Sequence, residues 1–310
     1  MAPSGFVTHA VRVVVPASSA NLGPGFDAMG LALGIHDEIT AMITDDQGIR
    51  IHVEGEGVGE VPTDETHLVA QAMNLGFATM NKIPAGYVIN CRNAIPHGRG
   101  LGSSAAAIIG GLAVARELVD GGSELLPDTE LLNIALSMEG HPDNVSASLY
   151  GGFTVSWLES PAVAGSVSIK LHPDVIPIVA VPPNPLATSM ARDVLDGQVL
   201  RSDATHNVAR AGLLVHAMSA NPEYLFPATA DALHQDARAH IYPETTALIA
   251  LLRAQNIAAV VSGAGPAVLM LIDKSQPAQL EVLAGLLPAD WTSVAVPVDQ
   301  EGVRRVEIPG

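Results

Sequence analysis

The sequence predicts an α+β protein folded into two lobes, and three observations support this prediction. Segments typical of strands and of helices are mixed along the chain without the strict alternation of a doubly wound sheet. The pattern starts again after about residue 170, so one lobe is expected over residues 1–170 and a second over residues 171–310. Hydrophobic residues make up 48% of the 310 residues and charged residues 15%, which is enough for a large packed core.

In the first lobe, strands and helices are expected in an irregular order. Val7–Val15 predicts a strand that ends at Pro16, and the Gly-, Pro- and Ser-rich segment 16–30 follows it. A pair of strands, Ile39–Ile43 and Ile49–Val53, is then expected around a polar turn. The rest of this lobe predicts helices over His67–Asn81, Ser103–Val119, Thr129–Met138 and Asn144–Leu149, and strands over Gly86–Cys91 and Gly152–Trp157.

The second lobe is expected to mix short apolar strands with longer helices. Period-two and continuous apolar runs predict the strands, and apolar spacing of three and four residues predicts the helices. The expected strands are Ile176–Val181, Ala258–Ser262, Val268–Ile272 and Trp291–Val296. The expected helices are Asp203–Met218, Glu244–Ala254 and Pro277–Leu286.

The composition argues against several classes of protein. The formal net charge is −17 at pH 7, which does not suit a nucleic-acid partner or an anionic membrane surface. No uncharged apolar run of membrane-spanning length is visible, and no signal peptide is expected. Cys91 is the only cysteine, so no intrachain disulfide can form and a reduced, cytoplasmic compartment is expected. With only three lysines, any phosphate chemistry must depend on backbone N–H groups, arginine and metal.

The strongest local signal is a glycine-rich loop followed by an alanine-rich helix. Glycines at alternate positions let the backbone bend and approach a ligand closely, because they lack a Cβ. The helix start offers N–H groups and the positive end of a dipole, which suit an anion such as phosphate. The pattern is neither a Walker loop nor a Rossmann fingerprint, and a serine cap after a flexible turn is the alternative. The predicted phosphate-binding residues are Pro96, His97, Gly98, Arg99, Gly100, Leu101, Gly102, Ser103, Ser104, Ala105 and Ala106.

A second polar segment, Ser18–Asp27, directly follows the first strand. Asn21 and Asp27 lie among glycines there and can face a polar substrate, with the amide suited to a hydroxyl and the carboxylate to an ammonium. The alternative is an ordinary turn, in which Asn and Asp side chains bond to their own backbone. The residues alone leave both interpretations open.

A third segment, Met138–Asn144, places two carboxylates, a histidine and an amide between apolar helices. Polar groups so dense among apolar ones need partners, which a metal ion or a substrate would supply. Glu139 is a candidate Mg²⁺ ligand, because Mg²⁺ takes few protein carboxylates and keeps phosphate and water oxygens. Zinc is not expected, since His141 has no His or Cys at ligand spacing. The alternative is a capped turn in which Asp143 or Asn144 starts the next helix.

These segments, in this order, resemble the motifs of the GHMP kinase superfamily, and the resemblance covers essentially the whole chain. The superfamily loop Pro-x-x-x-Gly-Leu-Gly-Ser-Ser-Ala is similar to Pro96–Ala105. Residues 19–27 and 139–145 resemble the homoserine kinase branch in particular. The resemblance implies a two-lobed GHMP fold, with an N-terminal nucleotide-binding lobe and a C-terminal ferredoxin-like lobe. It also implies a turn at residues 263–266 that closes over the phosphates and the substrate.

For function, the resemblance implies phosphoryl transfer from ATP to L-homoserine, a step of threonine biosynthesis. ATP would lie on the Pro96–Ala106 loop, and Mg²⁺ would be held by Glu139 with Ser103 or Ser104. Asp27 would face the substrate ammonium, and two arginine forks would bind its carboxylate. The residues implied to line the substrate pocket are Asn21, Asp27, His141, Asn144, Arg192 and Arg238.

The resemblance further implies a mechanism without a strong base. Homoserine kinases carry asparagine, here Asn144, where mevalonate-type relatives have an aspartate, so we expect Asn144 to orient the hydroxyl while positioning and electrostatics do the rest. Asn144 and Arg192 are the residues expected to act in catalysis. His67 lies where relatives place asparagine near adenine, which leaves nucleotide selectivity open. The alternatives are a mevalonate-type GHMP kinase or a non-catalytic ligand sensor of this fold, and the family allows a homodimer.

Overall fold

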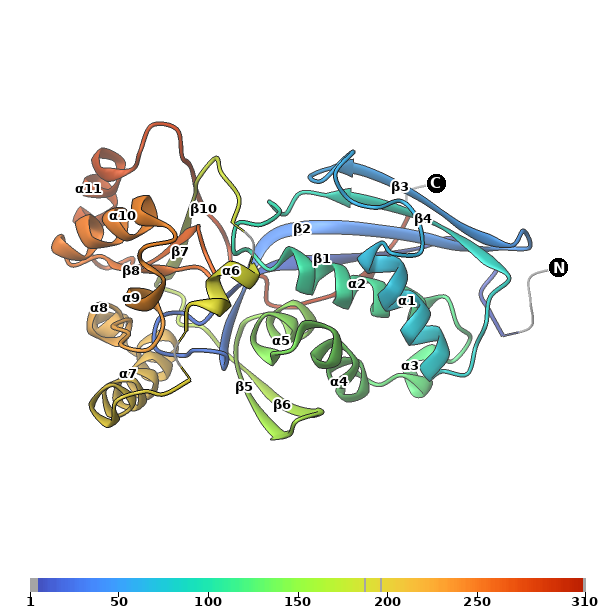
Figure 1. Cartoon of the computed structure of the whole chain (residues 1–310), viewed down its shortest axis with the longest axis horizontal. Coiled ribbons are helices and arrows are strands. Elements are labelled where there is room, and N and C mark those ends of the chain that lie inside the picture. Colours follow the sequence, from blue (N-terminus) through green and yellow to red (C-terminus); the bar gives the residue numbers. More distant parts are fainter. Residues whose placement is uncertain (1–4, 187, 196, 309–310) are drawn as a thin grey trace.

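The computed structural model describes residues 5–186, 188–195 and 197–308, apart from the side chains of residues 188, 189 and 192. Figure 1 shows two lobes side by side along the longest axis, with the first half of the chain on the right and most of the second half on the left. Within the described residues, one sheet of seven strands and one sheet of four strands form these lobes. The predicted α+β architecture is confirmed.

The larger sheet has the strand order β11-β1-β2-β4-β3, with β5 and β6 extending it from β2. Alternate residues of β1 enter the main core, where Val11, Val13 and Val15 are buried. The expected end of this strand at Pro16 is wrong, because a register shift after the proline lets β1 continue to Ala20. The strands are β1 (Val11–Ala20), β2 (Met29–Thr44), β3 (Gly48–Gly55), β4 (Gly86–Asn93), β5 (Phe153–Ser160), β6 (Val163–Ile169) and β11 (Arg304–Val306).

The two strands expected around the polar turn are both present, but they do not pair with each other. Strand β4 lies between them, antiparallel to β2 and parallel to β3. A parallel pair needs a crossover connection, and helix α1 (Leu68–Thr79) supplies it between β3 and β4. This crossover brings the residues that precede α1 close to the glycine-rich loop that follows β4.

Helices cover one face of the larger sheet (Figure 1). Helices α2 (Ser103–Glu117) and α5 (Pro142–Tyr150) pack directly on β1 and β2, and α1 and α4 (Asp128–Glu139) flank them. Helix α2 is buried along most of its length, which explains its alanines and glycines: a Cβ on Gly111 would lie 2.6 Å from the Val69 carbonyl oxygen of α1. The short helix α3 (Gly122–Leu125) connects α2 to α4.

The smaller sheet has the strand order β10-β7-β9-β8, and all of its neighbouring strands are antiparallel. Its strands are β7 (Val175–Val181), β8 (Ala258–Val261), β9 (Val268–Asp273) and β10 (Thr292–Ala295). Helices α10 (Pro243–Ala254) and α11 (Ala278–Leu286) pack against the sheet around a second core. This is the strand–helix–strand–strand–helix–strand order of a ferredoxin-like unit, as expected.

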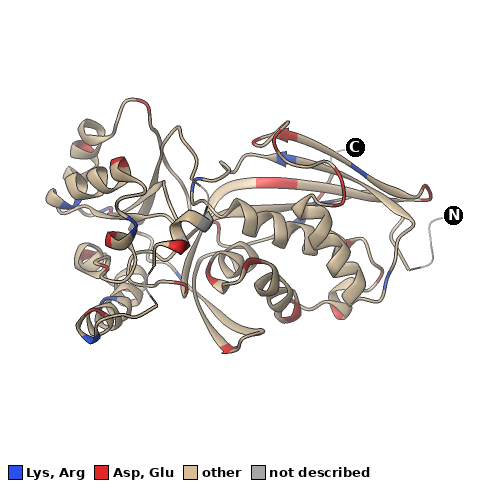
Figure 2. Ribbon diagram, viewed as in Figure 1, with Lys and Arg blue, Asp and Glu red and all other residues tan. Residues whose placement is uncertain are grey.

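A group of helices between β7 and α10 brings the second lobe to the junction of the lobes. Helix α6 lies between the two lobes in Figure 1. The members of this group are α6 (Thr188–Asp193), α7 (Arg201–Ser219), the 3₁₀ helix η1 (Pro222–Tyr224), α8 (Leu225–Ala228) and α9 (Gln235–Arg238). Acidic residues are spread over both lobes, with the fewer basic residues scattered among them (Figure 2). No helix in the described part of the chain is long and apolar enough to span a membrane.

After β10 the chain returns to the first lobe, where β11 pairs with β1. Asp299 holds this return: its carboxylate accepts hydrogen bonds from the N–H groups of Glu301 and Gly302 and pairs with His36 and Arg304. Desolvation alone would raise the pKa of Asp299, but these partners hold the pKa well below its ordinary range. The last strand, β11, therefore belongs to the larger sheet of the first lobe and not to the smaller sheet of the second. The boundary between the lobes at residue 170 stays a prediction.

Candidate active site

The predicted phosphate loop turns sharply at its alternate glycines. Gly98, Gly100 and Gly102 have φ values between 64° and 76°, in the left-handed region that disfavours a side chain. A Cβ on Gly100 would lie 2.2 Å from the Ser262 carbonyl oxygen, and one on Gly102 would lie 2.1 Å from Ser18 Oγ. The glycines are therefore needed both for the turn and for close packing against β1 and the 262–266 turn.

The start of α2 is open to an anion. Its N-cap is Gly102, which has no side chain to bond the first-turn N–H groups. The serine-cap alternative is therefore wrong, because Ser103 and Ser104 are the first residues inside the helix. Ala105 and Ala106 are fully buried, and the Ala106 N–H bonds to the Gly102 carbonyl at 2.9 Å. An anion placed before α2 would meet the remaining N–H groups and the positive end of the dipole.

Arg99 joins the phosphate loop to the second lobe. Its guanidinium donates hydrogen bonds of 2.5 to 2.9 Å to the carbonyl oxygens of His97, Pro182 and Pro183. The Leu186 N–H donates to the Gly98 carbonyl at 2.8 Å, and this segment leads into α6. Arg99 thus holds backbone groups of both lobes, and its expected contact with ATP stays a prediction.

Asn21 and Asp27 lie in the loop between β1 and β2, and both have positive φ, at 68° and 54°. Asn and Asp tolerate this conformation better than most residues, and such strain is typical of functional sites. Asn21 Oδ1 accepts from the Asp27 N–H at 3.0 Å, and Asn21 Nδ2 donates to the Gly263 carbonyl at 2.8 Å. Asn21 therefore joins this loop to the 263–266 turn while also lining the cavity described below.

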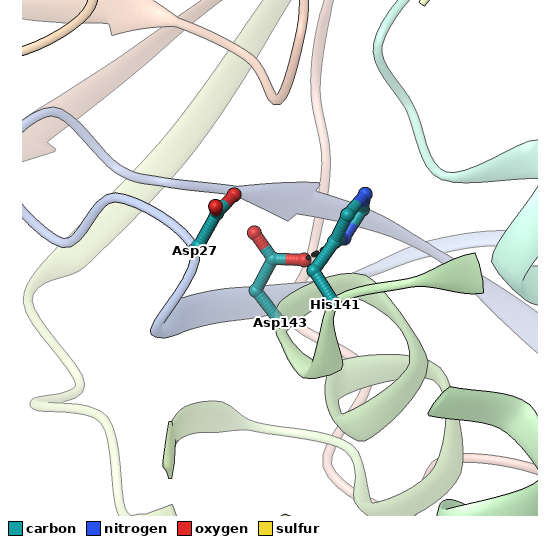
Figure 3. Close-up of side chains that lie close together, drawn as sticks. All are labelled: Asp27, His141 and Asp143. Atoms are coloured by element: carbon teal, nitrogen blue, oxygen red, sulfur yellow. Dashed lines mark hydrogen bonds and ion pairs between the residues drawn. The ribbon is translucent and has the colours of Figure 1, made fainter. Parts of the chain in front are cut away.

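Three titratable side chains converge beside this loop. Figure 3 shows Asp27, His141 and Asp143 pointing toward one space, from the β1–β2 loop and from the start of α5. Their ligand atoms lie within 4.8 Å of one another. Asp143 is 1% exposed, and its Oδ1 accepts from the Asn144 N–H at 2.7 Å and pairs with His141 Nδ1 at 2.8 Å. Two carboxylates this close favour a positively charged group between them.

Asn144 is oriented by a buried serine. Ser18 is fully buried, and its Oγ donates to Asn144 Oδ1 at 2.9 Å, with Ser148 Oγ 3.4 Å from Ser18 Oγ. Because Oδ1 already accepts this hydrogen bond, the donor Nδ2 is the amide atom left for a ligand in the cavity. The amide therefore suits a ligand oxygen.

Glu139, the last residue of α4, meets the start of α2. Ser104 Oγ donates to Glu139 Oε1 at 2.9 Å. A hydroxyl and a carboxylate side by side at a phosphate-binding loop are the hard oxygen ligands that Mg²⁺ takes in proteins. Of the two predicted serines, Ser104 is the one that contacts Glu139, so these residues fit the ion.

Two cavities meet at Ser103 and Ser104, which line both. The first, of about 120 Å³, is lined by the phosphate loop and by Asn21, Glu139, His141, Asp143, Asn144, Arg238, Gly263 and Ala264. The second, of about 280 Å³, lies toward α1, and its lining includes Ile39, Val61, Pro62, Leu68, Val69, His67 and His97. His67 caps α1, since its Nδ1 accepts from the Val69 N–H at 3.2 Å, and burial lowers its pKa.

Arg238 is a buried cation in the first cavity's wall. It is 1% exposed, so it is not an ordinary surface charge. Its Nε donates to the Ala191 carbonyl at 2.6 Å and its NH1 donates to His234 Nδ1 at 3.1 Å. Arg192 follows Ala191 in α6, but its side chain lies outside the described part of the structure, so its expected role stays a prediction.

The structure gathers most of the predicted residues around one cavity, although their roles remain predictions. Asp27 joins them through the cluster with His141 and Asp143, whereas His97 contacts the second cavity. Sequence reasoning did not select Ser18, Asp143 or His234. Asp143 and Ser18 lie inside the polar segments already singled out. The neighbouring sequence, however, does not distinguish a side chain that orients another side chain from one that contacts a ligand.

Comparison with known proteins identifies the relatives of this chain. Residues 67–152 match the GHMP kinases N terminal domain, and residues 204–282 match the GHMP kinases C terminal domain. A homoserine kinase of Streptomyces coelicolor is 47% identical over 302 residues, covering 97% of this chain and 96% of that protein. A homoserine kinase of Mycolicibacterium smegmatis is 48% identical over 269 residues, covering 84% of each chain.

Solved structures agree with these matches. A homoserine kinase structure from Cytophaga hutchinsonii has a TM-score of 0.78 at 24% identity, covering 96% of this chain and 97% of that one. A mevalonate diphosphate decarboxylase from Staphylococcus aureus has a TM-score of 0.69 at 16% identity, covering 96% and 98%. The fold, the glycine-rich loop and both domain matches define the class, a GHMP-type small-molecule kinase. Within that class, identity of 47% over almost the full length shows that the chain belongs to the homoserine kinase family.

Proposed function

We propose that this chain transfers the γ-phosphoryl group of ATP to the side-chain hydroxyl of L-homoserine, giving O-phospho-L-homoserine and ADP. The observation that supports the proposal is a single cavity that is lined both by the glycine-rich loop with the start of α2 and by the polar groups of Asn21, His141, Asp143, Asn144 and Arg238. Asn144 adjoins both sides, because it follows Asp143 and lies beside Gly102 at the start of α2.

The recognition groups fit the two charged ends of an amino acid. Asp27 and Asp143 would face the ammonium, since their carboxylates converge where a cation is favoured. Arg238 would bind the carboxylate, joined by Arg192 from α6 as the family resemblance implies. A buried ion pair needs a partner for every charge, so a zwitterion suits this cavity better than a neutral alcohol does.

The nucleotide would span both cavities. Its phosphates would lie on the loop at the start of α2, and its base would enter the mainly apolar cavity beside His67. Ser104 and Glu139 would hold Mg²⁺, which supplies charge stabilisation to the transferring phosphoryl group when bound. The turn at 263–266 would cover the phosphates, because Ser262 Oγ and Asn21 Nδ2 already bind it to neighbouring loops.

The chemistry would proceed by positioning rather than by a strong base. The homoserine hydroxyl oxygen forms a bond to the γ-phosphorus, the bond to the β–γ bridging oxygen breaks, and the hydroxyl proton passes to a phosphate oxygen. Asn144 Nδ2–H would donate to the attacking oxygen and hold it in line, with Ser18 fixing the amide. The loop N–H groups and the dipole of α2 would stabilise the charge that spreads over the phosphoryl oxygens.

We also propose that the protein performs this step of threonine biosynthesis in the cytoplasm. Cys91 supports that compartment, because it is buried and unpaired with another cysteine. Burial raises the pKa of its thiol to about 12, so it is expected to be unreactive.

The test is ADP release with ATP and Mg²⁺ in the presence of L-homoserine, mevalonate, galactose or no acceptor. Turnover with L-homoserine alone, giving the O-phospho ester, is the expected result. Turnover with mevalonate alone would retain the kinase fold and overturn the assignment of Asp27, Asp143 and Arg238. ATP binding without acceptor-dependent turnover would make the chain a ligand sensor.

A further inference from the structure

A fully buried histidine, His234, lies directly behind the cavity just before α9. It is 0% exposed, its Nε2 lies 2.9 Å from the Gly23 carbonyl oxygen, and its Nδ1 lies 3.1 Å from Arg238 NH1. A guanidinium can only donate and a carbonyl oxygen can only accept. His234 must therefore be neutral, with its proton on Nε2: it accepts from Arg238 and donates to Gly23.

These two hydrogen bonds connect the two sides of the amino-acid site. Gly23 belongs to the β1–β2 loop that carries Asp27, and Phe26 of the same loop stacks on the imidazole with ring centroids 5.1 Å apart and planes at 25°. The Arg238 guanidinium carbon lies 5.5 Å from the centre of the Phe26 ring. The imidazole of His234 therefore contacts both the loop that carries Asp27 and the guanidinium of Arg238.

We propose that His234 is a positioning residue that sets the separation between Asp27, at the ammonium end of the substrate, and Arg238, at its carboxylate end. This inference depends on the proposed function, because it assumes an α-amino acid in the cavity. Nδ1 of His234 holds the guanidinium of Arg238 in place, and Nε2–H of His234 holds the backbone of the β1–β2 loop at Gly23. The spacing of the two recognition groups would then be set by the width of a rigid, planar ring.

Burial and Arg238 lower the pKa of His234, whereas the two nearby carboxylates raise it. Asp231 from the segment before α9, Arg238 from α9 and Asp27 from the β1–β2 loop are the charged groups that act on it. The Asp231 carboxylate is occupied by the Asn207 amide and by the N–H groups of residues 233, 234 and 235. Burial lowers the pKa of His234 despite Asp231. Protonation would end the acceptor role of Nδ1 and set two cations side by side.

Two conservative substitutions separate the two hydrogen bonds. The end of an asparagine side chain reaches the position of Nδ1, so His234→Asn keeps an acceptor for Arg238 and loses the donor to Gly23. The end of a glutamine side chain reaches the position of Nε2, so His234→Gln keeps that donor and loses the acceptor. His240→Asn, on an exposed neighbouring position, is the matched control.

The readout is selectivity between homoserine and two analogues that each lack one charged end. The analogues are aminopropanol, without the carboxylate, and γ-hydroxybutyrate, without the ammonium. In His234→Gln the kcat/KM preference for homoserine over aminopropanol is expected to fall about tenfold, with little change against γ-hydroxybutyrate. In His234→Asn the opposite pattern is expected. The KM for ATP should stay within about twofold in both variants, because neither change touches the phosphate loop.

Equal loss of both preferences in both variants, no loss in either, or a matching rise in the KM for ATP would overturn the inference. Nitrogen NMR of the wild-type protein gives a test that does not depend on the stability of a variant. It should show the His234 ring protonated on Nε2 alone at pH 7, and protonation on Nδ1 would refute the proposal. Failure of the wild type to phosphorylate homoserine would instead refute the proposed function.

Discussion

Replacing Asn144 by aspartate tests whether this site works without a base. In the wild type, Ser18 Oγ donates to Asn144 Oδ1, so the amide offers a donor to the attacking hydroxyl. In Asn144→Asp, Ser18 would still donate to one carboxylate oxygen. The second carboxylate oxygen would take the place of Nδ2, so a negatively charged acceptor would replace the donor. An aspartate there could remove the hydroxyl proton, which is what a base-dependent mechanism requires.

The expected result is a slower enzyme, because the new charge faces the phosphates. Two unit charges about 4 Å apart at an effective dielectric constant of about 20 repel by about 4 kcal/mol. The half-charge at the start of α2 offsets about 1 kcal/mol of this repulsion. The remaining 3 kcal/mol or so corresponds to a loss in kcat of about 100-fold. The KM for homoserine should change little, since its charged ends are bound elsewhere.

Single-turnover kinetics at saturating ATP and homoserine would measure this loss, with Ser18→Ala as the matched control. That control keeps the amide but frees it to rotate, and one lost hydrogen bond of this kind corresponds to a decrease in kcat of about tenfold. A kcat for Asn144→Asp above that of the wild type at pH 7, rising further with pH, would refute the reasoning. Such a profile would mean that proton removal limits the rate.

Three further predictions concern the metal ligands, the C-terminal return and the junction of the lobes. Ser104→Ala should raise the Mg²⁺ concentration that gives the half-maximal rate about tenfold, and Ser103→Ala should raise this concentration less. Equal effects of the two substitutions would contradict the pairing of Ser104 with Glu139. Asp299→Asn should lower the free energy of unfolding in denaturant by about 2 kcal/mol at pH 7. Because the folded-state pKa of Asp299 is depressed, that difference should hold above about pH 4 and shrink as the pH falls further, and a constant difference would contradict the assignment. Because Arg99 holds backbone groups of both lobes, we expect a non-hydrolysable ATP analogue to tighten homoserine binding in calorimetry. Arg99→Gln should weaken this coupling about fivefold, whereas the exposed Arg92→Gln should leave it unchanged; equal coupling in the wild type and in Arg99→Gln would contradict this role of Arg99.

Local chemistry explains why much of the fold could be predicted from the sequence. The alternate glycines of residues 98–102 predict a loop that bends sharply, and their positive φ values agree with this, since few other residues tolerate that conformation. The expected helix over Ser103–Val119 starts where α2 starts, because glycine and serine punctuate the apolar pattern there. The strands of the second lobe were predicted to within a few residues for the same reason: polar turns bound short apolar runs.

Pairings between distant segments could not be predicted in this way. Strand β3 lies beside β4 rather than β2 because of the α1 crossover, and no residue of β3 specifies that choice by itself. Strands β6 and β11 were not expected from the sequence. In the case of β11 the reason is its composition, because it has only three residues and two of them are arginines. In the site, Ser18 and Asn144 are 126 residues apart, and Asn21 and Gly263 are 242 apart. Such contacts depend on how the whole chain packs.

The pairing of β11 with β1 has a consequence for the way the protein is made. Val14 and Arg304 are Cα partners in that pairing and lie 290 residues apart in the chain. While a ribosome synthesises the protein, β1 therefore keeps one open edge until β11 has emerged. Unpaired edges of partly folded chains are where aggregation begins. We infer that this protein depends most on chaperones while its first lobe has been synthesised and β11 has not yet emerged.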